Sequence, residues 1–328
     1  MRRQRGSYAT PDGNKHLTDH GNFEHSMREI WAVASRYLIL SGLFFLPRSR
    51  RIAIERRLRG KEEYRKLQLA DWVLMSWGKS GRTWFRVMLS RFYQVKHDLP
   101  ENLLLDFDNL HGRNPAIPRV LFSHNNYMRD YLKDWTTLEH FRGKKIVLLV
   151  RDPRDVAVSQ FFQWKYRMRP HKKLLNEYPP HKADISTWDF VTDRKAGVPR
   201  IVDYFNGWAH RAPNAADLLV IRYEDMRKDP DAVMQKVLEF TGTPGTPEQI
   251  REAVEFAAYD NMKKMEEKKA FRLSGARVKP GDKNNPDSFK VRRAKVGGYR
   301  DYFDDQQVAT IDAMVDQLDP MFGYTSAQ

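Results

Sequence analysis

Residues 71–92 read DWVLMSWGKSGRTWFRVMLSRF, and this stretch decides the fold. The apolar run at 71–76 is typical of a buried β-strand, and an amphipathic helix is predicted to begin at Thr83. The turn between them is short and holds two glycines, so its backbone N–H groups and the helix N-terminus can face one anion. Lys79 adds a cation to this turn. The stretch therefore predicts a phosphate-binding loop.

The loop is shorter than the Walker A loop that wraps a nucleoside triphosphate. A Walker A loop has the pattern G-x-x-x-x-G-K-[ST]. With Lys79 and Ser80 as its last two residues, the first glycine would fall on Val73, which lies inside the predicted strand. No predicted strand ends in an obvious acidic ligand for Mg²⁺. A phosphate loop and a helix-capping turn with an incidental lysine both stay open from these residues alone.

Further along the chain, strand-like and helix-like segments alternate. Short apolar runs, each followed by a helical pattern, are predicted to be strands at 119–124, 144–150 and 217–223. Strands that alternate with helices are typical of a parallel sheet. The sequence therefore predicts an α/β fold with a central parallel β-sheet and helices on both of its faces.

A second candidate anion site follows the strand at 144–150, in the stretch LLVRDPRDVAVSQFF. Arg151 stands at the carboxyl end of that strand, where α/β folds bind their ligands. Ser159 lies about two helical turns further on. Together a guanidinium and a hydroxyl can bind a phosphate. The alternative is that Arg151 forms an ion pair with Asp155 at the start of the helix.

The composition points to anionic partners and a reducing compartment. The 328 residues include 57 Lys and Arg against 42 Asp and Glu, and no cysteine. Positions 1–70 alone hold 15 basic and 7 acidic residues, a net charge of +8, and the rest carries +7. The absence of cysteine excludes disulfides, thiolate metal sites and cysteine nucleophiles. The charge alone does not choose among nucleic acid, a membrane surface and a multiply charged small molecule.

The first 66 residues form a basic N-terminal extension with one apolar helix. Residues 1–25 are polar and rich in turn formers, so we expect them to be flexible. Residues 30–46 are almost entirely apolar, yet they are short for a membrane span and contain Arg36. We expect Pro47 to end this helix. A helix at the membrane interface and a helix packed on a partner or on its own domain both stay open.

Five motifs, in order, resemble the sulfotransferase family that uses 3′-phosphoadenosine 5′-phosphosulfate (PAPS). They are W-x-K-S-G-x-T-W at 77–84, S-H at 123–124, R-D-P-R-D-V-A-V-S at 151–159, Y-E-D-M-x-x-D-P at 223–230 and R-R-A-K-V-G-G-Y at 292–299. The resemblance covers about residues 68–305. It implies a P-loop-NTPase-like three-layer fold for a sulfotransferase domain at 67–328. It also implies PAPS as co-substrate and 3′-phosphoadenosine 5′-phosphate (PAP) as product.

The resemblance assigns the first loop to the 5′-phosphosulfate. Lys79 would stabilise the charge that develops on the bridging oxygen as the S–O bond breaks. The residues that would hold the 5′-phosphate are Ser80, Gly81 and Thr83, and Trp84 would stack on the adenine. The chain departs from the family pattern in two places, because Gly78 replaces a proline and Arg82 replaces a threonine. Arg82 would either bind the phosphate as well or turn to solvent.

His124 matches the family's catalytic base. A neutral imidazole can accept the proton of an acceptor hydroxyl as that hydroxyl attacks sulfur. The family lysine two residues earlier is Phe122 here, so its contribution is lost or supplied elsewhere. The candidate catalytic residues are Lys79, His124 and Ser159.

The remaining motifs would bind the 3′-phosphate and the adenine. Arg151 and Ser159 match the residue pair that binds the 3′-phosphate. The segment Arg292, Arg293 and Ala294 matches R-K-G, which closes over the same phosphate, and Gly297, Gly298 and Tyr299 match G-D-W. Tyr223 would hydrogen-bond the adenine, and Tyr259 would cover its other face or serve as a core aromatic residue.

These matches imply in-line transfer of a sulfuryl group to an acceptor hydroxyl or amine, without a metal. The acceptor would be a small molecule or a molecule of lipid or sugar type. The basic and aromatic residues 163–200 suit an acceptor of acidic or sugar character, with an ordinary solvated surface as the alternative, and the apolar, arginine-flanked helix near Ile30 suits a lipid-linked acceptor. The loop at 274–290 is expected to become ordered over the donor. The protein is expected to be cytoplasmic, with peripheral membrane contact through residues 28–59, a homodimer left open, and no nucleic-acid partner. The alternatives are a P-loop kinase-like phosphotransferase and a basic nucleic-acid- or membrane-binding protein without catalysis.

Overall fold

The computed structural model describes residues 31, 33–133, 138–268, 271 and 278–325. Their strands form a single parallel sheet in the order β2-β1-β3-β4. The strands are β1 (Trp72–Ser76), β2 (Val120–Ser123), β3 (Lys145–Val150) and β4 (Leu218–Arg222). All four predicted strands are confirmed, and each of their ends lies within one residue of the prediction.

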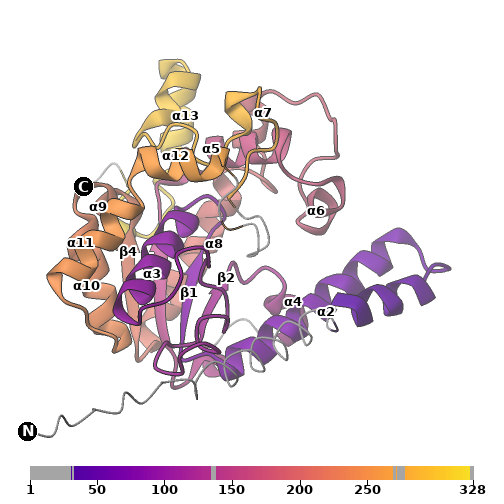
Figure 1. The fold of residues 1–328 in the computed structure, drawn as a ribbon. Coiled ribbons are helices and arrows are strands. Elements are labelled where there is room, and N and C mark those ends of the chain that lie inside the picture. Colours follow the sequence, from indigo (N-terminus) through magenta and orange to yellow (C-terminus); the bar gives the residue numbers. More distant parts are fainter. Residues whose placement is uncertain (1–30, 32, 134–137, 269–270, 272–277, 326–328) are drawn as a thin grey trace, which may run out of the picture.

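Strands β1, β2 and β3 are largely buried because both faces of the sheet are covered, and the edge strand β4 is half-buried. Along β1, Val73 and Met75 point into one hydrophobic core, whereas Trp72 and Leu74 point into the other. Successive side chains of a strand alternate between its faces, so one apolar run supplies both cores. The predicted three-layer arrangement, with helices on both faces of a parallel sheet, is confirmed (Figure 1).

The helices divide between the two faces. The first core also contains side chains of helices that cover one face, namely α5 (Pro153–Tyr166), α7 (Thr187–Thr192), α8 (Val198–Arg211) and α13 (Asp305–Val315). The second core contains side chains of α3 (Arg82–Lys96), α10 (Pro230–Thr241), α11 (Pro247–Phe256) and α12 (Tyr259–Glu267). The remaining α-helices are α2 (Arg48–Leu69), α4 (Met128–Leu132), α6 (Pro170–Leu175) and α9 (Tyr223–Lys228). The 3₁₀ helices are η1 (Glu139–Phe141), η2 (Ala212–Asn214), η4 (Pro286–Ser288), η5 (Gly298–Tyr302) and η6 (Pro320–Phe322).

The apolar N-terminal segment forms a helical hairpin with α2, and this hairpin extends away from the sheet (Figure 1). Residues 33–42 are helical, and the chain then turns over 43–46. The prediction that the helix continues to Leu46 is wrong, because the tighter i to i+3 hydrogen bonds of Leu43 and Leu46 replace the helical ones. Residues 1–25, predicted to be flexible, lie outside the described residues.

A buried ion pair joins the two arms of the hairpin. Arg36 donates to Glu62 at 2.9 Å, and the arginine side chain is only 9% exposed. This ion pair explains why Arg36 can lie within an otherwise apolar segment. None of the helices in the described part of the chain is both long enough and apolar enough to cross a membrane.

The α2 helix crosses the predicted domain boundary at residue 67 and packs against α4. Arg56 bonds to Asp130 at 2.5 Å and to the carbonyl of Asn126 at 3.1 Å. Gly60 lets the backbones approach, because a Cβ on this residue would lie 2.1 Å from the carbonyl oxygen of Tyr127. The division into 1–66 and 67–328 stays a prediction, and the end of the extension is tied to the sheet domain.

We predict that Gly60→Ala destabilises the chain, although alanine normally stabilises a helix interior by about 0.5–1 kcal/mol relative to glycine. The new methyl group would push α2 away from α4, and we expect a loss of about 1–3 kcal/mol. The free energy of unfolding, measured by denaturant titration, checks this.

Gly42→Ala is the matched control, because no atom lies within 4 Å of the position that its Cβ would take. We expect this variant to be at least as stable as the unmodified chain. A Gly60→Ala variant of unchanged or increased stability would show that α2 does not pack closely on α4.

Candidate active site

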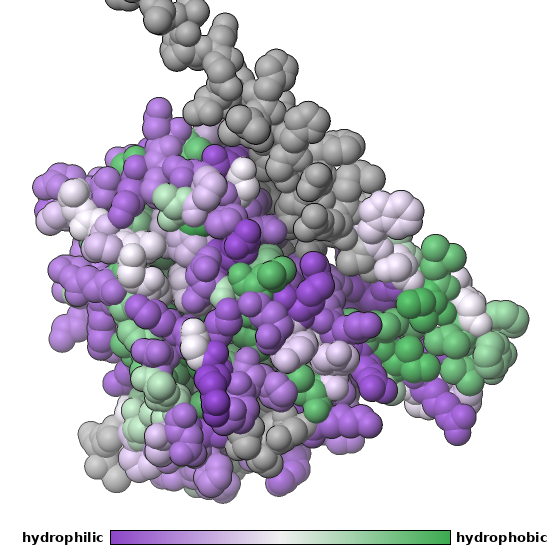
Figure 2. Space-filling view, turned by 90° about the horizontal axis from the view of Figure 1, so that it is seen from below, coloured by the Kyte–Doolittle hydropathy of each residue, from purple (hydrophilic) through white to green (hydrophobic). Residues whose placement is uncertain are grey.

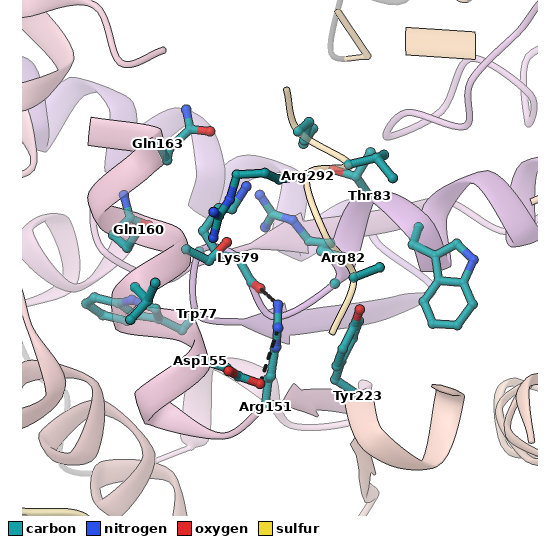
Figure 3. A pocket seen from close by; sticks show the side chains of 18 of the residues that line it. Trp77, Lys79, Arg82, Thr83, Arg151, Asp155, Gln160, Gln163, Tyr223 and Arg292 are labelled. Carbon is teal, nitrogen blue, oxygen red and sulfur yellow. Dashed lines mark hydrogen bonds and ion pairs between the residues drawn. The ribbon is translucent and has the colours of Figure 1, made fainter. Parts of the chain in front are cut away.

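A cavity of about 380 Å³ opens at the carboxyl ends of the strands (Figure 3). It collects nearly all of the predicted site residues, although the motifs are far apart in the sequence. The predicted residues that line it are Lys79, Gly81, Arg82, Thr83, Trp84, His124, Arg151, Ser159, Tyr223, Tyr259, Arg292, Arg293 and Ala294. Ser80 is the exception, because it lies behind the loop and is fully buried.

The loop between β1 and α3 is held in a conformation that needs a glycine. Gly81 has φ 99°, in the region that L side chains rarely adopt. Its backbone also lies against Tyr223, and a Cβ would come within 2.6 Å of that ring. Gly81 is the residue before α3, and no side chain caps this helix. The first N–H groups of α3 are therefore available to an anion.

The hydroxyl of Ser80 supports the phosphate assignment of this loop. Its Oγ is buried and makes no hydrogen bond within the described part of the chain. A buried hydroxyl without a partner costs free energy, so such groups usually have a ligand or a water as partner. The residues present thus suit a phosphate group.

His124 follows β2 and forms two short hydrogen bonds. Its Nδ1 lies 2.7 Å from the carbonyl oxygen of Ser76, and its Nε2 lies 2.6 Å from Nη2 of Arg82. A guanidinium only donates, and a carbonyl only accepts. The imidazole is therefore neutral, with its proton on Nδ1 and its Nε2 lone pair directed at Arg82. Burial, and after it the charge of Arg82, hold the pKa of His124 well below its usual value.

This contact adds a partner for Arg82 that the sequence did not indicate, and its binding to a phosphate stays a prediction. The sequence placed its guanidinium either on a phosphate or in solvent, and the structure places it on the candidate base. Arg82 is the first residue of α3, so its side chain starts beside the phosphate-binding N-terminus and extends from there toward His124. A motif comparison gives the position of a side chain but not the direction in which it turns.

Arg151 connects the two predicted anion sites. Its Nη1 donates to the carbonyl of Lys79 at 3.2 Å, and its guanidinium lies over the ring of Tyr223 at 4.2 Å from the centroid. It also approaches Asp155 at 3.5 Å, so the ion pair considered as an alternative is present as well (Figure 3). Asp155 accepts from the N–H groups of Gly297 and Tyr299 at 2.9 and 3.0 Å, which fixes the late motif above the cavity.

A buried carboxylate that the sequence analysis missed holds the other end of this segment. Glu266, on α12, is 0% exposed and accepts from the N–H groups of Lys290 and Val291 at 2.6 and 2.9 Å. Arg167 pairs with the same carboxylate at 2.8 Å. The backbone is thereby fixed where Lys290 enters the cavity. The one feature of the sequence that could have indicated a site role for Lys290 is its position two residues before Arg292.

The cavity concentrates positive charge. Its lining includes nine Lys and Arg side chains and one carboxylate, that of Asp155. Burial and the nearby charges of Arg167 and Arg151 lower the pKa of Lys79 to about 7. Burial, together with Lys79 and Arg167, lowers the pKa of Lys290 well below its usual value. Bringing so many cations together is costly without an anion, so the site is built for a multiply charged ligand.

An aromatic wall lies beside the phosphate-binding loop. The rings of Trp84 and Tyr223 meet edge to face at 6.0 Å, and the indole N–H donates to the carbonyl of Ala257 at 2.9 Å. The hydroxyl of Tyr259 donates to the carbonyl of Arg292 at 3.2 Å. Tyr259 is therefore exposed to the cavity rather than packed in the core. These rings form a flat apolar surface next to the cations, as a nucleobase requires.

A different set of side chains lines the opposite part of the cavity, near His124. The guanidinium of Arg200 lies between the rings of Trp77 and Tyr178, at 5.7 and 5.8 Å from their centroids. Asn176 accepts from Asn126 at 3.1 Å through its side chain. Aromatic faces together with amides and a guanidinium suit a ring that carries several hydroxyl groups. The described residues contain no group of His, Asp and Glu side chains that could hold a metal ion.

The chain was compared with known proteins. The model of the sulfotransferase domain matches residues 69–321. The chain is similar to cytosolic sulfotransferase 17 of Arabidopsis thaliana, with 24% identity over 297 residues that cover 81% of this chain and 79% of the relative. It is also similar to flavonol 3-sulfotransferase of Flaveria bidentis, with 24% identity over 265 residues that cover 75% and 81%.

Two solved structures share the fold. The mouse sulfotransferase SULT7A1 in complex with PAP has a TM-score of 0.51 and 20% identity, over 78% of this chain and 88% of the other. Retinol dehydratase in complex with retinol and PAP has a TM-score of 0.51 and 18% identity, over 78% and 82%. The predicted P-loop-NTPase-like fold is thus confirmed.

We predict that Arg82→Thr raises the pKa of His124 in the ligand-free chain. The variant removes a positive charge and a donor from Nε2, so protonation of the ring becomes easier, although burial still opposes it. NMR titration of the histidine rings measures this pKa, with His124→Asn to assign the resonance. Arg142→Thr, an exposed arginine elsewhere, is the control.

The Arg82→Thr substitution should also alter how the free energy of unfolding depends on pH. The folded chain binds the His124 proton more weakly than the unfolded chain, so the free energy of unfolding decreases as the pH falls below about 6.5. Arg82→Thr should reduce this decrease. An unchanged titration of His124 in the variant would show that Arg82 does not contact the ring in solution.

Proposed function

The chain belongs to the sulfotransferase domain family and is a PAPS-dependent sulfotransferase, and from this premise we propose that Lys79 and His124 carry out its chemistry. PAPS supplies an activated sulfuryl group when it is bound. His124 takes the proton of the acceptor hydroxyl or amine at Nε2. Lys79 stabilises the charge that develops on the leaving phosphate. The observation that carries this proposal is that both side chains line one cavity together with the phosphate-binding loop.

The tautomer of His124 supports its role as base. Its Nδ1 proton is directed at the carbonyl of Ser76, which leaves the Nε2 lone pair on the side of the cavity where Arg82 lies. For Nε2 to accept a proton, Arg82 must turn away. The phosphates of the donor, bound beside the α3 N-terminus, offer the guanidinium a stronger partner than a neutral imidazole. Donor binding therefore frees the base.

The donor phosphates also change the charge of Lys79. With a pKa of about 7, this amine is only partly protonated near neutral pH. A phosphate beside it raises its pKa and makes it a full cation at the position where charge develops. On the other side of the donor, Ser159, Arg151, Arg292 and Arg293 would hold the 3′-phosphate. Tyr223, Trp84 and Tyr259 would hold the adenine. No metal has a part in this proposal.

We propose that Lys290 replaces the lysine that the family pattern has at position 122. Phe122 takes no part in the cavity lining, because Arg86 stacks on its ring at 3.8 Å from the centroid. Lys290 lines the cavity, and its charge is among the influences that lower the pKa of His124. Glu266 fixes the backbone that carries it. The negative charge of the bound donor would raise the lowered pKa of Lys290, and the resulting ammonium group can stabilise the oxygens of the sulfuryl group during transfer.

For the acceptor, we propose a small molecule of sugar type, with a lipid-linked form as the second candidate. The support is the wall of Trp77, Tyr178, Arg200 and amide side chains on the His124 side of the cavity. Relatives named cytosolic sulfotransferases support a cytoplasmic location as part of this proposal. Contact of residues 28–59 with a membrane and a homodimer stay predictions. Family membership favours sulfuryl transfer over the kinase-like and the non-catalytic alternatives.

Transfer of ³⁵S from labelled PAPS to candidate acceptors tests the two central residues. We expect Lys79→Ala and His124→Ala to lose at least a hundredfold in turnover, while His124→Ala still binds PAP. The controls are Lys228→Ala and His210→Ala, which replace exposed residues of the same types. Turnover by His124→Ala at the rate of the unmodified chain would refute its assignment as base.

A separate variant tests Lys290. We expect Lys290→Met to lower kcat by about a hundredfold with little change in PAP affinity, because the ammonium acts on charge that develops during transfer. Lys290→Arg should retain part of the rate. Lys283→Met, on the same loop but exposed, is the control. A weaker PAP affinity with an unchanged kcat would make Lys290 a donor-binding residue only.

A further inference from the structure

The exposed apolar side chains of the chain are concentrated at one place. Among the described residues, eleven large hydrophobic side chains are exposed, and seven of them lie between positions 31 and 45. They are Trp31, Val33, Tyr37, Leu38, Ile39, Phe44 and Phe45, and five of the seven are more than 60% exposed. Figure 2 shows them as one hydrophobic projection beside a largely hydrophilic body. This surface runs along the first arm of the hairpin and over its turn, and we call it the hairpin tip.

The hairpin tip is exposed because the hairpin extends away from the body of the chain. Its exposure is not due to missing packing within the hairpin. Arg36 and Glu62 join the two arms of the hairpin, and the α2 arm packs on α4 through Arg56 and Gly60. The apolar side chains point away from this packing. A patch of this kind on a soluble domain marks an interaction site.

The charges around the hairpin tip are of one sign. From residue 31 to residue 54 the sequence has four arginines and no acidic residue. Arg48 and Arg50 are exposed and directly follow the turn that carries Phe44 and Phe45. Exposed aromatic and aliphatic side chains beside arginines suit the surface of an anionic bilayer. The apolar side chains can contact the acyl chains, and the arginines can contact the anionic headgroups. A protein partner would need acidic groups around an apolar groove, whereas an anionic bilayer offers both features over its whole surface.

We propose that the hairpin tip is a docking element for anionic lipid bilayers. Its apolar side chains enter the boundary between headgroups and acyl chains, and the exposed Arg48 and Arg50 bind lipid phosphates. The element lies in the interface without crossing it, because no described helix is long and apolar enough to span a bilayer. Peripheral docking of this kind is reversible and weakens with increasing salt concentration.

The hairpin is also connected to the acceptor side of the cavity. On α2, Glu55 bonds to His171 at 2.7 Å, and Arg56 bonds to the carbonyl of Leu175, the residue before Asn176 of the cavity wall. Docking therefore fixes the orientation of that wall relative to the bilayer. This connection, unlike the docking itself, bears on function only if the proposed sulfuryl transfer is correct.

Co-sedimentation of the full chain with vesicles tests the proposal. The probes are vesicles of phosphatidylcholine alone and vesicles with about 30% phosphatidylglycerol, a fraction that gives the strong negative surface on which such docking depends. We expect the chain to bind the anionic vesicles at least tenfold more tightly, and to dissociate at high salt. Brominated lipids should quench part of the tryptophan fluorescence, and Trp31→Phe should abolish this quenching.

Two double variants separate the apolar contribution from the electrostatic one. Phe44→Ser with Phe45→Ser should weaken vesicle binding at least tenfold, with Met321→Ser, another exposed apolar residue, as the control. Arg48→Glu with Arg50→Glu should weaken it by about fivefold or more for each residue. The matched control is Arg142→Glu with Arg251→Glu, two exposed arginines elsewhere. All variants should bind PAP like the unmodified chain.

Several outcomes would overturn the proposal. One is that the serine double variant binds anionic vesicles as tightly as the unmodified chain. Another is that both vesicle types bind equally and the glutamate variant has no effect. A third is that no vesicle binds, while light scattering shows a dimer that the serine variant dissociates, which would make the hairpin tip an interface between copies of this chain. Vesicle binding needs no turnover, so its failure is distinguishable from failure of the proposed sulfotransferase activity.

Discussion

The parallel pairing of β1 with β3 on one side and β2 on the other is the constraint on which the site depends. It brings the loops after the three strands to the same edge of the sheet, although they are up to about 70 residues apart in the chain. The hydrogen bond from Arg151 to the carbonyl of Lys79 follows directly from this pairing. The approach of His124 to the carbonyl of Ser76 has the same origin. Without the sheet these residues would have no reason to meet.

The sequence was sufficient for those features that depend on local pattern. Apolar runs between helical segments predicted all four strands, and the predicted catalytic and donor-binding residues, with the exception of Ser80, line one cavity. Features that depend on side-chain direction were not predictable. Arg82 turns to His124 because the ring and the start of α3 happen to be neighbours in space. Glu266 and Lys290 meet across a stretch of chain in which no motif indicates a contact. The hairpin tip was recognised as apolar, but its exposure could be decided only by the packing of α2.

Repulsion among the cations that line the cavity determines how the site would respond to an anionic donor. Lys79, Arg151, Arg292 and Lys290 are held together by the fold and not by attraction for one another. The lowered pKa of Lys79 is a measure of that repulsion. Anionic groups that enter the cavity remove it, and they also attract the guanidinium that occupies Nε2 of His124. In the proposed mechanism, the same electrostatic change strengthens donor binding and frees Nε2 of His124, so the acceptor proton would be taken only after the donor is in place.

The α2 helix connects the N-terminal extension to the sheet domain, which argues against treating the two as separate units. At one end it carries the turn with Phe44 and Phe45, and at the other its Glu63 bonds to Ser123, the residue before His124. Burial raises the pKa of that carboxyl group. Between these ends, Arg56 reaches the wall that faces the acceptor. One helix therefore touches the proposed docking surface, the proposed acceptor wall and the residue before the candidate base. Truncation before residue 67 would remove parts of all three, so a truncated chain cannot test the docking surface alone, whereas substitutions at the hairpin tip can.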